Sequence, residues 1–218
     1  MTPQIAVLDY GMGNRRSVQK ALEHVGAQVA VTSDLELLRG AAGVVIPGVG
    51  AFPEAMSRLQ ALGLVEPLRS LASQRMPILG ICLGMQLLFD ASEEIEPTPG
   101  LGLLPGRVSR LQSSERLPHI GWNEVRLQRP SALTAGLPTG GCPFYHVHSL
   151  AARPEHAGDV VGSTTYGETF ATVVERDRVA GVQFHPEKSS AHGLRLLANY
   201  VGLCADSSAG RIGLATPA

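Results

Sequence analysis

The chain has 218 residues, of which 44% are hydrophobic and 17% are charged, and its formal net charge is −1. A chain of this length is typical of one large α/β domain, and its near-zero charge gives no support for nucleic acid or an anionic membrane as a partner. No apolar stretch is long enough to span a bilayer, and the N-terminus opens on a strand-like run with no visible signal peptide.

The first part of the chain alternates between short apolar runs and segments with helical spacing. Val18, Leu22 and Val25 recur at intervals that place them on one face of a helix, and Asn14 stands where the N-cap of that helix would be. Since each parallel crossover needs a helix, this alternation predicts a parallel sheet covered on both faces. Strands are expected at residues 4–10, 27–32, 43–48 and 77–81, and helices after Asn14, at 33–40, within 52–74 and at 83–91.

The pattern changes at about residue 106, where the apolar runs become short, β-like and separated by turn residues. These runs predict a small antiparallel region beside the parallel sheet, and a final helix is expected after Ser190. The fold class is therefore α/β in a single domain, with a mostly parallel central sheet flanked by helices. We expect the domain to cover residues 1–203 and the small, polar, Gly-rich segment 204–218 to be a disordered tail.

Cys82 lies between two glycines where a predicted strand gives way to a predicted helix, in the segment GICLGMQLL (80–88). Gly80 and Gly84 flank it in the Gly-x-nucleophile-x-Gly pattern of a nucleophile elbow, a sharp turn in which larger neighbours would collide. Free N–H groups at the start of the helix would favour negative charge on the sulfur. The pattern makes Cys82 a candidate nucleophile, while a buried structural cysteine is the plainer interpretation of a lone thiol.

The other two cysteines, Cys142 and Cys204, do not stand in the Gly-x-Cys-x-Gly pattern of an elbow. Three cysteines at wide spacing favour neither a disulfide framework nor a zinc site. They indicate a reducing compartment, which here means the cytoplasm.

A histidine and a glutamate stand together after the last predicted strand, in the segment GVQFHPEKS (181–189). His185 and Glu187 are two residues apart, and in an extended backbone such side chains point to the same side. A carboxylate in this place can orient an imidazole and stabilise its protonated form. Because open α/β sheets gather their sites at the carboxyl ends of their strands, we expect His185 to meet Cys82 there. The two segments together predict a Cys–His–Glu triad.

On these two segments the chain resembles the triad-type, class-I glutamine amidotransferase family, and the resemblance extends to about residue 203. Four further segments resemble one branch of that family, whose members pass ammonia to a separate cyclase in histidine biosynthesis: DYGMGNRRSV (9–18), PGVGAF (47–52), PHIGWNEV (118–125) and FYHVHS (144–149). The resemblance implies a glutaminase that needs neither a metal nor another cofactor. It also implies a heterodimer with an αβ-barrel cyclase.

The resemblance also implies roles for individual residues. Cys82 would attack the side-chain amide of L-glutamine, and His185, oriented by Glu187, would move the protons. Backbone N–H groups would form an oxyanion hole for the developing charge. By the same resemblance, Val49, Gly50 and Leu83 would supply the oxyanion hole, Gln86, Glu94, His148 and Ser149 would bind glutamine, and Asn14 and Trp122 would face the partner.

Several of these residues have plainer interpretations that the sequence leaves open. Asn14 also fits a simple helix cap, Trp122 also fits a core residue, and Glu94 belongs to an acidic run of the kind that is usually solvated. The Gly-x-Gly after the first strand is not a dinucleotide fingerprint, because the third glycine would fall at Arg16. His146 and Leu150 stand where the family more often has aromatic residues.

Three other functions remain open alongside the leading one. The chain also fits a glutaminase subunit of an anthranilate- or aminodeoxychorismate-type synthase, although the segments DYGMGN and PHIGWN argue against that client. A non-catalytic binding subunit of the same fold is a second alternative, and a cysteine peptidase or γ-glutamyl hydrolase acting alone is a third. No domain for a second substrate fits in a chain of this length, so an ammonia-consuming reaction must occur on another polypeptide.

Overall fold

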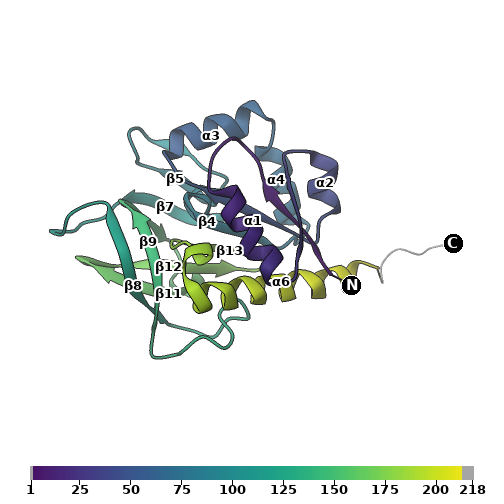
Figure 1. The fold of residues 1–218 in the computed structure, drawn as a ribbon. Coiled ribbons are helices and arrows are strands. Elements are labelled where there is room, and N and C mark those ends of the chain that lie inside the picture. The colour runs from purple at the N-terminus through teal and green to yellow at the C-terminus, as the bar shows by residue number, and fades with distance from the viewer. Residues whose placement is uncertain (1, 213–218) are drawn as a thin grey trace.

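The computed structural model describes residues 2–212, which form a nine-stranded sheet with helices on both faces (Figure 1). The first five strands in spatial order are parallel, and the last four continue the same sheet in antiparallel order. The predicted α/β class is confirmed, and the antiparallel strands extend the central sheet from its edge. In spatial order they are β2 (Gln28–Thr32), β1 (Gln4–Leu8), β3 (Gly43–Gly48), β4 (Ile78–Cys82), β13 (Val179–Val182), β12 (Glu168–Arg176), β11 (Val160–Tyr166), β8 (His119–Leu127) and β9 (Cys142–His148).

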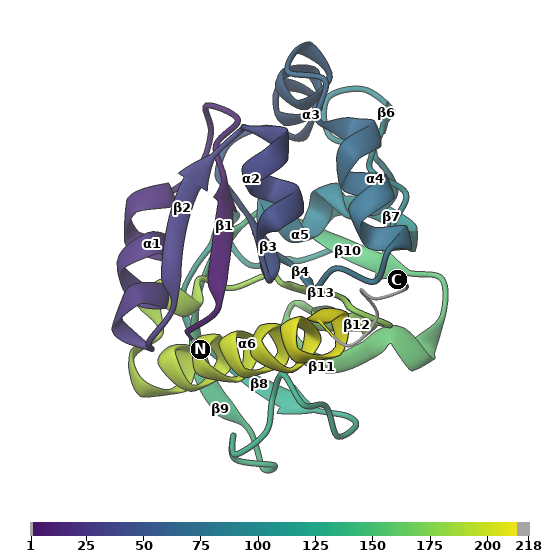
Figure 2. The same ribbon diagram turned by 90° about the vertical axis from the view of Figure 1, so that its right-hand side faces the viewer.

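Helices cover both faces of the parallel half of the sheet (Figure 2). Residues alternate along β1, so that Ile5 and Val7 pack toward one set of helices and Ala6 and Leu8 toward the other. A strand that is buried on both faces therefore reads as a continuous apolar run. One face carries α1 (Arg15–His24) and α6 (Ser190–Ile212), and the other carries α2 (Leu35–Gly40), α3 (Phe52–Ala61), α4 (Val65–Ser73) and α5 (Leu83–Leu87).

A second, smaller sheet corrects the prediction of one helix over residues 83–91. The helix α5 ends at Leu87, and the chain then enters a strand. The backbone N–H groups of Leu103 and Leu104 donate to the carbonyl of Leu88 at 2.8 and 3.0 Å, so the returning chain takes the acceptor that a longer helix would use. The strands of this sheet, in spatial order, are β10 (Leu150–Pro154), β7 (Leu104–Arg110), β5 (Phe89–Ser92) and β6 (Thr98–Pro99).

The C-terminal helix α6 continues to Ile212, so the domain boundary expected at residue 203 lies inside a helix. Disorder was expected from residue 204, and residues 204–212 are helical instead. Cys204 is fully buried, and its sulfur and the Tyr200 hydroxyl fill the space that a side chain at Gly43 would need. At Cys204, tertiary packing thus holds the start of a segment whose composition alone indicates disorder, and the remainder of the expected tail, 213–218, lies outside the described residues. Over residues 2–212, none of the helices is both long and apolar enough to cross a bilayer.

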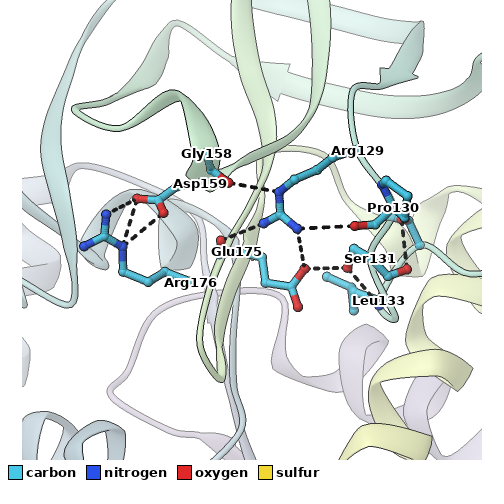
Figure 3. A network of polar contacts seen from close by, with 9 residues as sticks. Arg129, Pro130, Ser131, Leu133, Gly158, Asp159, Glu175 and Arg176 are labelled. Atoms are coloured by element: carbon cyan, nitrogen blue, oxygen red, sulfur yellow. Dashed lines mark hydrogen bonds and ion pairs between the residues drawn. The ribbon is translucent and has the colours of Figure 1, made fainter.

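Arg129 connects the loop between β8 and β9 with β12 and with the short turn that precedes β11 (Figure 3). Nε of Arg129 donates to the carbonyl of Gly158 and Nη2 donates to the carbonyl of Glu175, both at 2.9 Å. The carboxylate of Glu175 in turn accepts a hydrogen bond from the hydroxyl of Ser131, which belongs to the same loop. A guanidinium fork can satisfy several acceptors at once, so this loop is held in place without regular secondary structure.

Candidate active site

The turn around Cys82 has the geometry of a nucleophile elbow. Cys82 is the last residue of β4 and directly precedes α5, and its backbone has φ +55° and ψ −113°, a conformation that few residues with side chains adopt. A Cβ at Gly84 would lie 1.7 Å from the carbonyl oxygen of Ile46, and one at Gly80 would lie 2.5 Å from the carbonyl oxygen of Gly84. Both glycines are therefore required by close backbone contacts, as the sequence pattern predicts.

Replacing Gly84 with alanine is expected to lower the free energy of unfolding by about 3 kcal/mol or more, because the backbone of β3 cannot yield to a methyl group at that distance. Urea denaturation of the purified chain measures this loss. Gly202→Ala is the matched control, since Gly202 lies in α6 with open space around its Cα, and it is expected to be neutral or slightly stabilising. Equal stability of Gly84→Ala and wild type would contradict the tight contact between β3 and α5.

The parallel register of three strands brings the separate motifs to one edge of the sheet. Gly48 of β3 pairs with Cys82 of β4, so the PGVG turn leaves the sheet beside the elbow. On the other side, Val182 of β13 pairs with Ile81, which places His185 three residues beyond the same edge. The carboxyl ends of β3, β4 and β13 therefore converge, as expected for a site in an open α/β sheet.

His185 connects the sulfur of Cys82 with the carboxylate of Glu187. It lines the same cavity as Cys82, and its Nδ1 lies 2.9 Å from Oε1 of Glu187, whose side chain is fully buried. Burial alone would lower the pKa of His185, but the contacts with Cys82 and Glu187 outweigh burial and raise the pKa to about 10. These neighbours favour the imidazolium form of His185, and the three predicted triad residues lie together at the carboxyl edge of the sheet.

Asn14 bonds the same carboxylate oxygen as His185. Its Nδ2 donates to Oε1 of Glu187 at 3.2 Å, although the two residues are far apart in the sequence. Asn14 occupies the N-cap position of α1, but its side chain makes no capping hydrogen bond. The simple cap interpretation therefore does not account for this side chain, which instead helps to fix the carboxylate that faces His185.

The backbone of His185 is anchored to β9 by a serine that no sequence motif singles out. The N–H of His185 donates to the carbonyl of Tyr145 at 2.9 Å. The hydroxyl of Ser189 donates to the carbonyl of His185 at 2.6 Å and accepts from the N–H of Tyr145 at 3.0 Å. These contacts hold the short helical turn η2 (Pro186–Lys188) against β9 and so fix the direction of the imidazole.

A cavity of about 300 Å³ opens beside the sulfur of Cys82. Pro118, Val147, Leu150 and Lys188 also line it, although no sequence motif had placed them there. Glu187 is not part of its wall and reaches it only through His185. The predicted site residues that do line this cavity are Val49, Gly50, Cys82, Leu83, Gln86, Glu94, His148, Ser149 and His185.

Glu94, although it belongs to an acidic run, hydrogen-bonds the start of α3. Its Oε2 accepts the backbone N–H of Phe52, the first residue of α3, at 2.6 Å, and its own N–H donates to the hydroxyl of Ser92 at 3.1 Å. Negative charge at a helix N-terminus is favourable. Glu94 is therefore not a freely solvated residue: it ties the segment that follows the PGVG turn to the loop after β5.

A chain of neutral histidines leads away from the cavity into β8. Nδ1 of His148 lies 2.8 Å from the carbonyl of Leu150, and because a carbonyl only accepts, this nitrogen carries the proton. Nε2 of His148 then accepts from Nδ1 of His119 at 3.2 Å. Burial lowers the pKa of His119, and it lowers that of His148 to about 4. His119 was missed in the sequence because nothing local distinguishes it.

His146, one of the two departures from the family pattern, is buried in the same cluster. One nitrogen of its ring lies 3.1 Å from the carbonyl of Phe144 and the other 3.0 Å from the hydroxyl of Thr172, so both nitrogens have partners, in β9 and in β12. Burial, and secondarily the nearby His148 and His119, lowers its pKa to about 3. This histidine is a core residue with internal partners, and it does not reach the cavity wall.

The free energy of unfolding is expected to fall as the pH drops from about 6.5 toward 4, because unfolded histidines bind protons that His146 and His148 do not bind in the fold. Each such proton contributes about 1.4 kcal/mol per pH unit. His146→Phe is expected to reduce this slope in urea denaturation over that range, whatever its effect at neutral pH. The exposed His24→Gln is the control, and an unchanged slope in His146→Phe would contradict the assignment.

Trp122 lies on the surface of β8, which removes the core interpretation. It is 54% exposed, the neighbouring Ile120 is 60% exposed, and the ring of Trp122 meets that of Tyr145 edge to face. Exposed aromatic and aliphatic side chains of this size are typical of a docking surface.

A family model of class-I glutamine amidotransferases matches residues 6–202 of this chain. The match covers most of the chain, and the chain therefore belongs to the class-I glutamine amidotransferase family.

Among the members of this family, the chain is similar to subunits of one synthase. Imidazole glycerol phosphate synthase subunit HisH of Moorella thermoacetica is 53% identical, in a match that covers 90% of this chain and 93% of that protein. The protein of the same name from Symbiobacterium thermophilum is 49% identical, with 93% and 95% covered. Among solved structures, PurLQS from Thermotoga maritima has a TM-score of 0.72 at 19% identity, covering 94% of this chain and 99% of the matched chain, a likeness of fold alone.

Proposed function

We propose that this chain is the glutaminase subunit of an imidazole glycerol phosphate synthase, which hydrolyses L-glutamine and passes the ammonia to a separate cyclase in histidine biosynthesis. The observation that carries the proposal is that His185 bonds Glu187 and lines the same cavity as Cys82. It occurs in a chain that matches proteins of that name over nearly their whole length. The setting would be the cytoplasm, where such biosynthesis takes place.

The reaction begins with the sulfur of Cys82. An imidazolium next to a cysteine favours the thiolate, which is the nucleophilic form. The thiolate attacks the side-chain amide carbon of glutamine and forms a tetrahedral intermediate. His185 donates a proton to the nitrogen, the C–N bond breaks, and ammonia leaves a γ-glutamyl thioester on Cys82. His185, now neutral, takes a proton from water, the hydroxide attacks the thioester, and glutamate leaves with regeneration of the thiolate and imidazolium.

The oxyanion of each tetrahedral intermediate needs donors at the carboxyl ends of β3 and β4. The N–H of Leu83 follows the nucleophile directly, and the turn at Val49 and Gly50 lies beside it in the register of the two strands. One such donor lowers the activation free energy by about 2.7–4 kcal/mol. Gly50 has φ +111°, in the region that glycine adopts readily, so the peptide planes of this turn can rotate.

Substrate binding is assigned to the wall of the same cavity. Gln86 and Glu94 would receive the amino-acid end of glutamine, since the oxygen of an amide and a carboxylate both accept hydrogen bonds from an ammonium group. His148 and Ser149 would contact glutamine from the side of β9. These assignments follow the family resemblance, and their presence at one cavity supports them.

The partner would be an αβ-barrel cyclase bound as a heterodimer, which makes imidazole glycerol phosphate and AICAR from an open-chain nucleotide and ammonia. Direct transfer is needed because ammonia is largely protonated in neutral water, and ammonium has no lone pair for attack. The exposed Trp122 and Ile120 offer an apolar docking surface on β8. Asn14, which bonds Glu187, would stand between the triad and the partner.

The proposal is tested by mixing the purified chain with the cyclase and following glutamate release, with and without the nucleotide ligand of the cyclase. We expect weak glutamine hydrolysis by the chain alone and strong stimulation in the liganded complex, because the PGVG turn would adopt its productive orientation there. Equal turnover in both conditions would contradict the dependence on a partner. Full stimulation by an anthranilate-type synthase in place of the cyclase would contradict the choice of client.

A further inference from the structure

Two buried amides connect the sulfur of Cys82 with a backbone carbonyl on the other side of the cavity. Gln183 is fully buried, and its Nε2 lies 3.8 Å from the sulfur, within hydrogen-bond range for this large atom. Its Oε1 accepts from Nε2 of Gln86 at 3.0 Å, and the same nitrogen of Gln86 donates to the carbonyl of Leu150 at 3.2 Å. No sequence motif had assigned a task to Gln183.

The direction of every hydrogen bond in this chain follows from its last member. The carbonyl of Leu150 only accepts, so the group of Gln86 that faces it must be the NH2. Both hydrogens of that NH2 are then used, one by Leu150 and one by Gln183, and the group of Gln183 that faces Gln86 must be its oxygen. The NH2 of Gln183 is consequently turned toward the sulfur, and rotating the amide would place two donors against each other.

The sulfur also faces one group that opposes a thiolate. The carbonyl oxygen of Val147 lies 3.9 Å away, where it can accept a hydrogen bond from a thiol but repels a negative charge. Gln183 can only donate to the sulfur and so favours the charged form. The carbonyl of Val147 therefore disfavours a negative charge on the sulfur and Gln183 favours it. A protonated His185 also favours the negative charge.

We propose that Gln183 is a positioning residue for the nucleophile: its amide N–H, fixed in direction by Gln86 and Leu150, donates to the Cys82 sulfur and favours the thiolate over the thiol. The same hydrogen bonds leave Oε1 of Gln86 available to accept from the substrate. One pair of amides therefore orients a donor toward the nucleophile and an acceptor toward the substrate. This inference rests on the proposed glutaminase function. It adds a donor to the sulfur beyond the triad.

The test measures the chemistry of the sulfur without turnover. The rate of alkylation of Cys82 by iodoacetamide is followed against pH in the full chain, and peptide mass mapping separates Cys82 from the other two cysteines. Gln183→Met keeps the shape but loses the donor, and Gln183→Glu places a carboxylate against the sulfur. Both are expected to raise the pH of half-maximal alkylation, by roughly one pH unit for Gln183→Met and by more for Gln183→Glu.

Thr172→Val is the matched control, because it also removes a buried hydrogen bond on a neighbouring strand but does not touch the sulfur, and its alkylation profile should match wild type. A wild-type profile in folded Gln183→Met would overturn the proposal. If neither Gln183 variant folds, Gln86→Met provides the test. It removes the NH2 group that fixes the orientation of the Gln183 amide, so the pH of half-maximal alkylation of Cys82 should again rise. An unchanged pH of half-maximal alkylation would overturn the inference. Failure of wild type to release glutamate would refute the proposed function alone, since alkylation does not require turnover.

Discussion

Replacing Cys82 with alanine is expected to reduce glutamine-dependent synthesis in the complex by roughly 10⁴-fold or more, because the thioester cannot form without the sulfur, which lies at the same cavity as His185. Glutamate release measures this loss directly. The cyclase in the same complex should still close the imidazole ring when ammonium salt is supplied, since its own chemistry does not involve this cavity. The contrast separates loss of the nucleophile from loss of the assembly.

Cys142→Ala provides the control for the loss of a buried thiol. Cys142 is 1% exposed in β9 and does not line the cavity, so this variant should retain glutamine-dependent turnover close to wild type. Substantial glutamate release by Cys82→Ala would place the nucleophile elsewhere and rule out the proposed role of the elbow.

Glu187→Gln is expected to lower glutaminase turnover by roughly 10²- to 10⁴-fold while leaving the fold intact. The substitution keeps the shape of the side chain and an oxygen for Asn14, but it removes the charge that stabilises the imidazolium. Steady-state glutamate release at saturating glutamine measures the effect. Glu66→Gln, on an exposed carboxylate paired with Arg69, should leave turnover unchanged.

The same variant should also change the pH profile. In wild type the contacts with Cys82 and Glu187 raise the pKa of His185 to about 10, so the proton donor stays charged well above neutral pH. Without the carboxylate this pKa falls, so the alkaline limb of the pH–activity profile should move to lower pH. An alkaline limb at the wild-type position would show that Glu187 does not set the protonation of His185.

The elbow and the alternating strands and helices of the parallel half could be predicted because their signals are local. Two glycines at fixed spacing report a turn that excludes side chains, and Cβ positions at Gly80 and Gly84 show why. His185 and Glu187 are close in sequence and follow a strand, so their position at the sheet edge required only the rule for parallel strands.

The extent of individual elements could not be predicted where distant contacts decide. The segment after Leu87 has the composition of a helix, yet the chain returning at Leu103 takes its carbonyls. Beyond residue 203 the small residues favour disorder by composition, yet Cys204 packs in the space beside Gly43 and the helix continues to Ile212. Both outcomes depend on a partner segment that no local pattern reveals.

The supporting residues of the site were hidden for the same reason. Asn14 bonds Glu187 from the other end of the chain, and His119 meets His148 only because β8 pairs with β9. Gln183 stood inside a recognised motif, but its task depends on Gln86 and Leu150, which approach from other elements. Sequence motifs thus indicated the proposed reacting groups, and the fold was needed to find the residues that contact them.

The proposed chemistry depends most directly on a covalent bond between substrate carbon and one sulfur. Incubation of the complex with a diazoketone analogue of glutamine, followed by peptide mass mapping, tests this. We predict a single adduct on the peptide that contains Cys82, none on Cys142 or Cys204, and loss of glutamate release in proportion to labelling. Full labelling at another residue, or undiminished glutamate release after Cys82 is labelled, would contradict it.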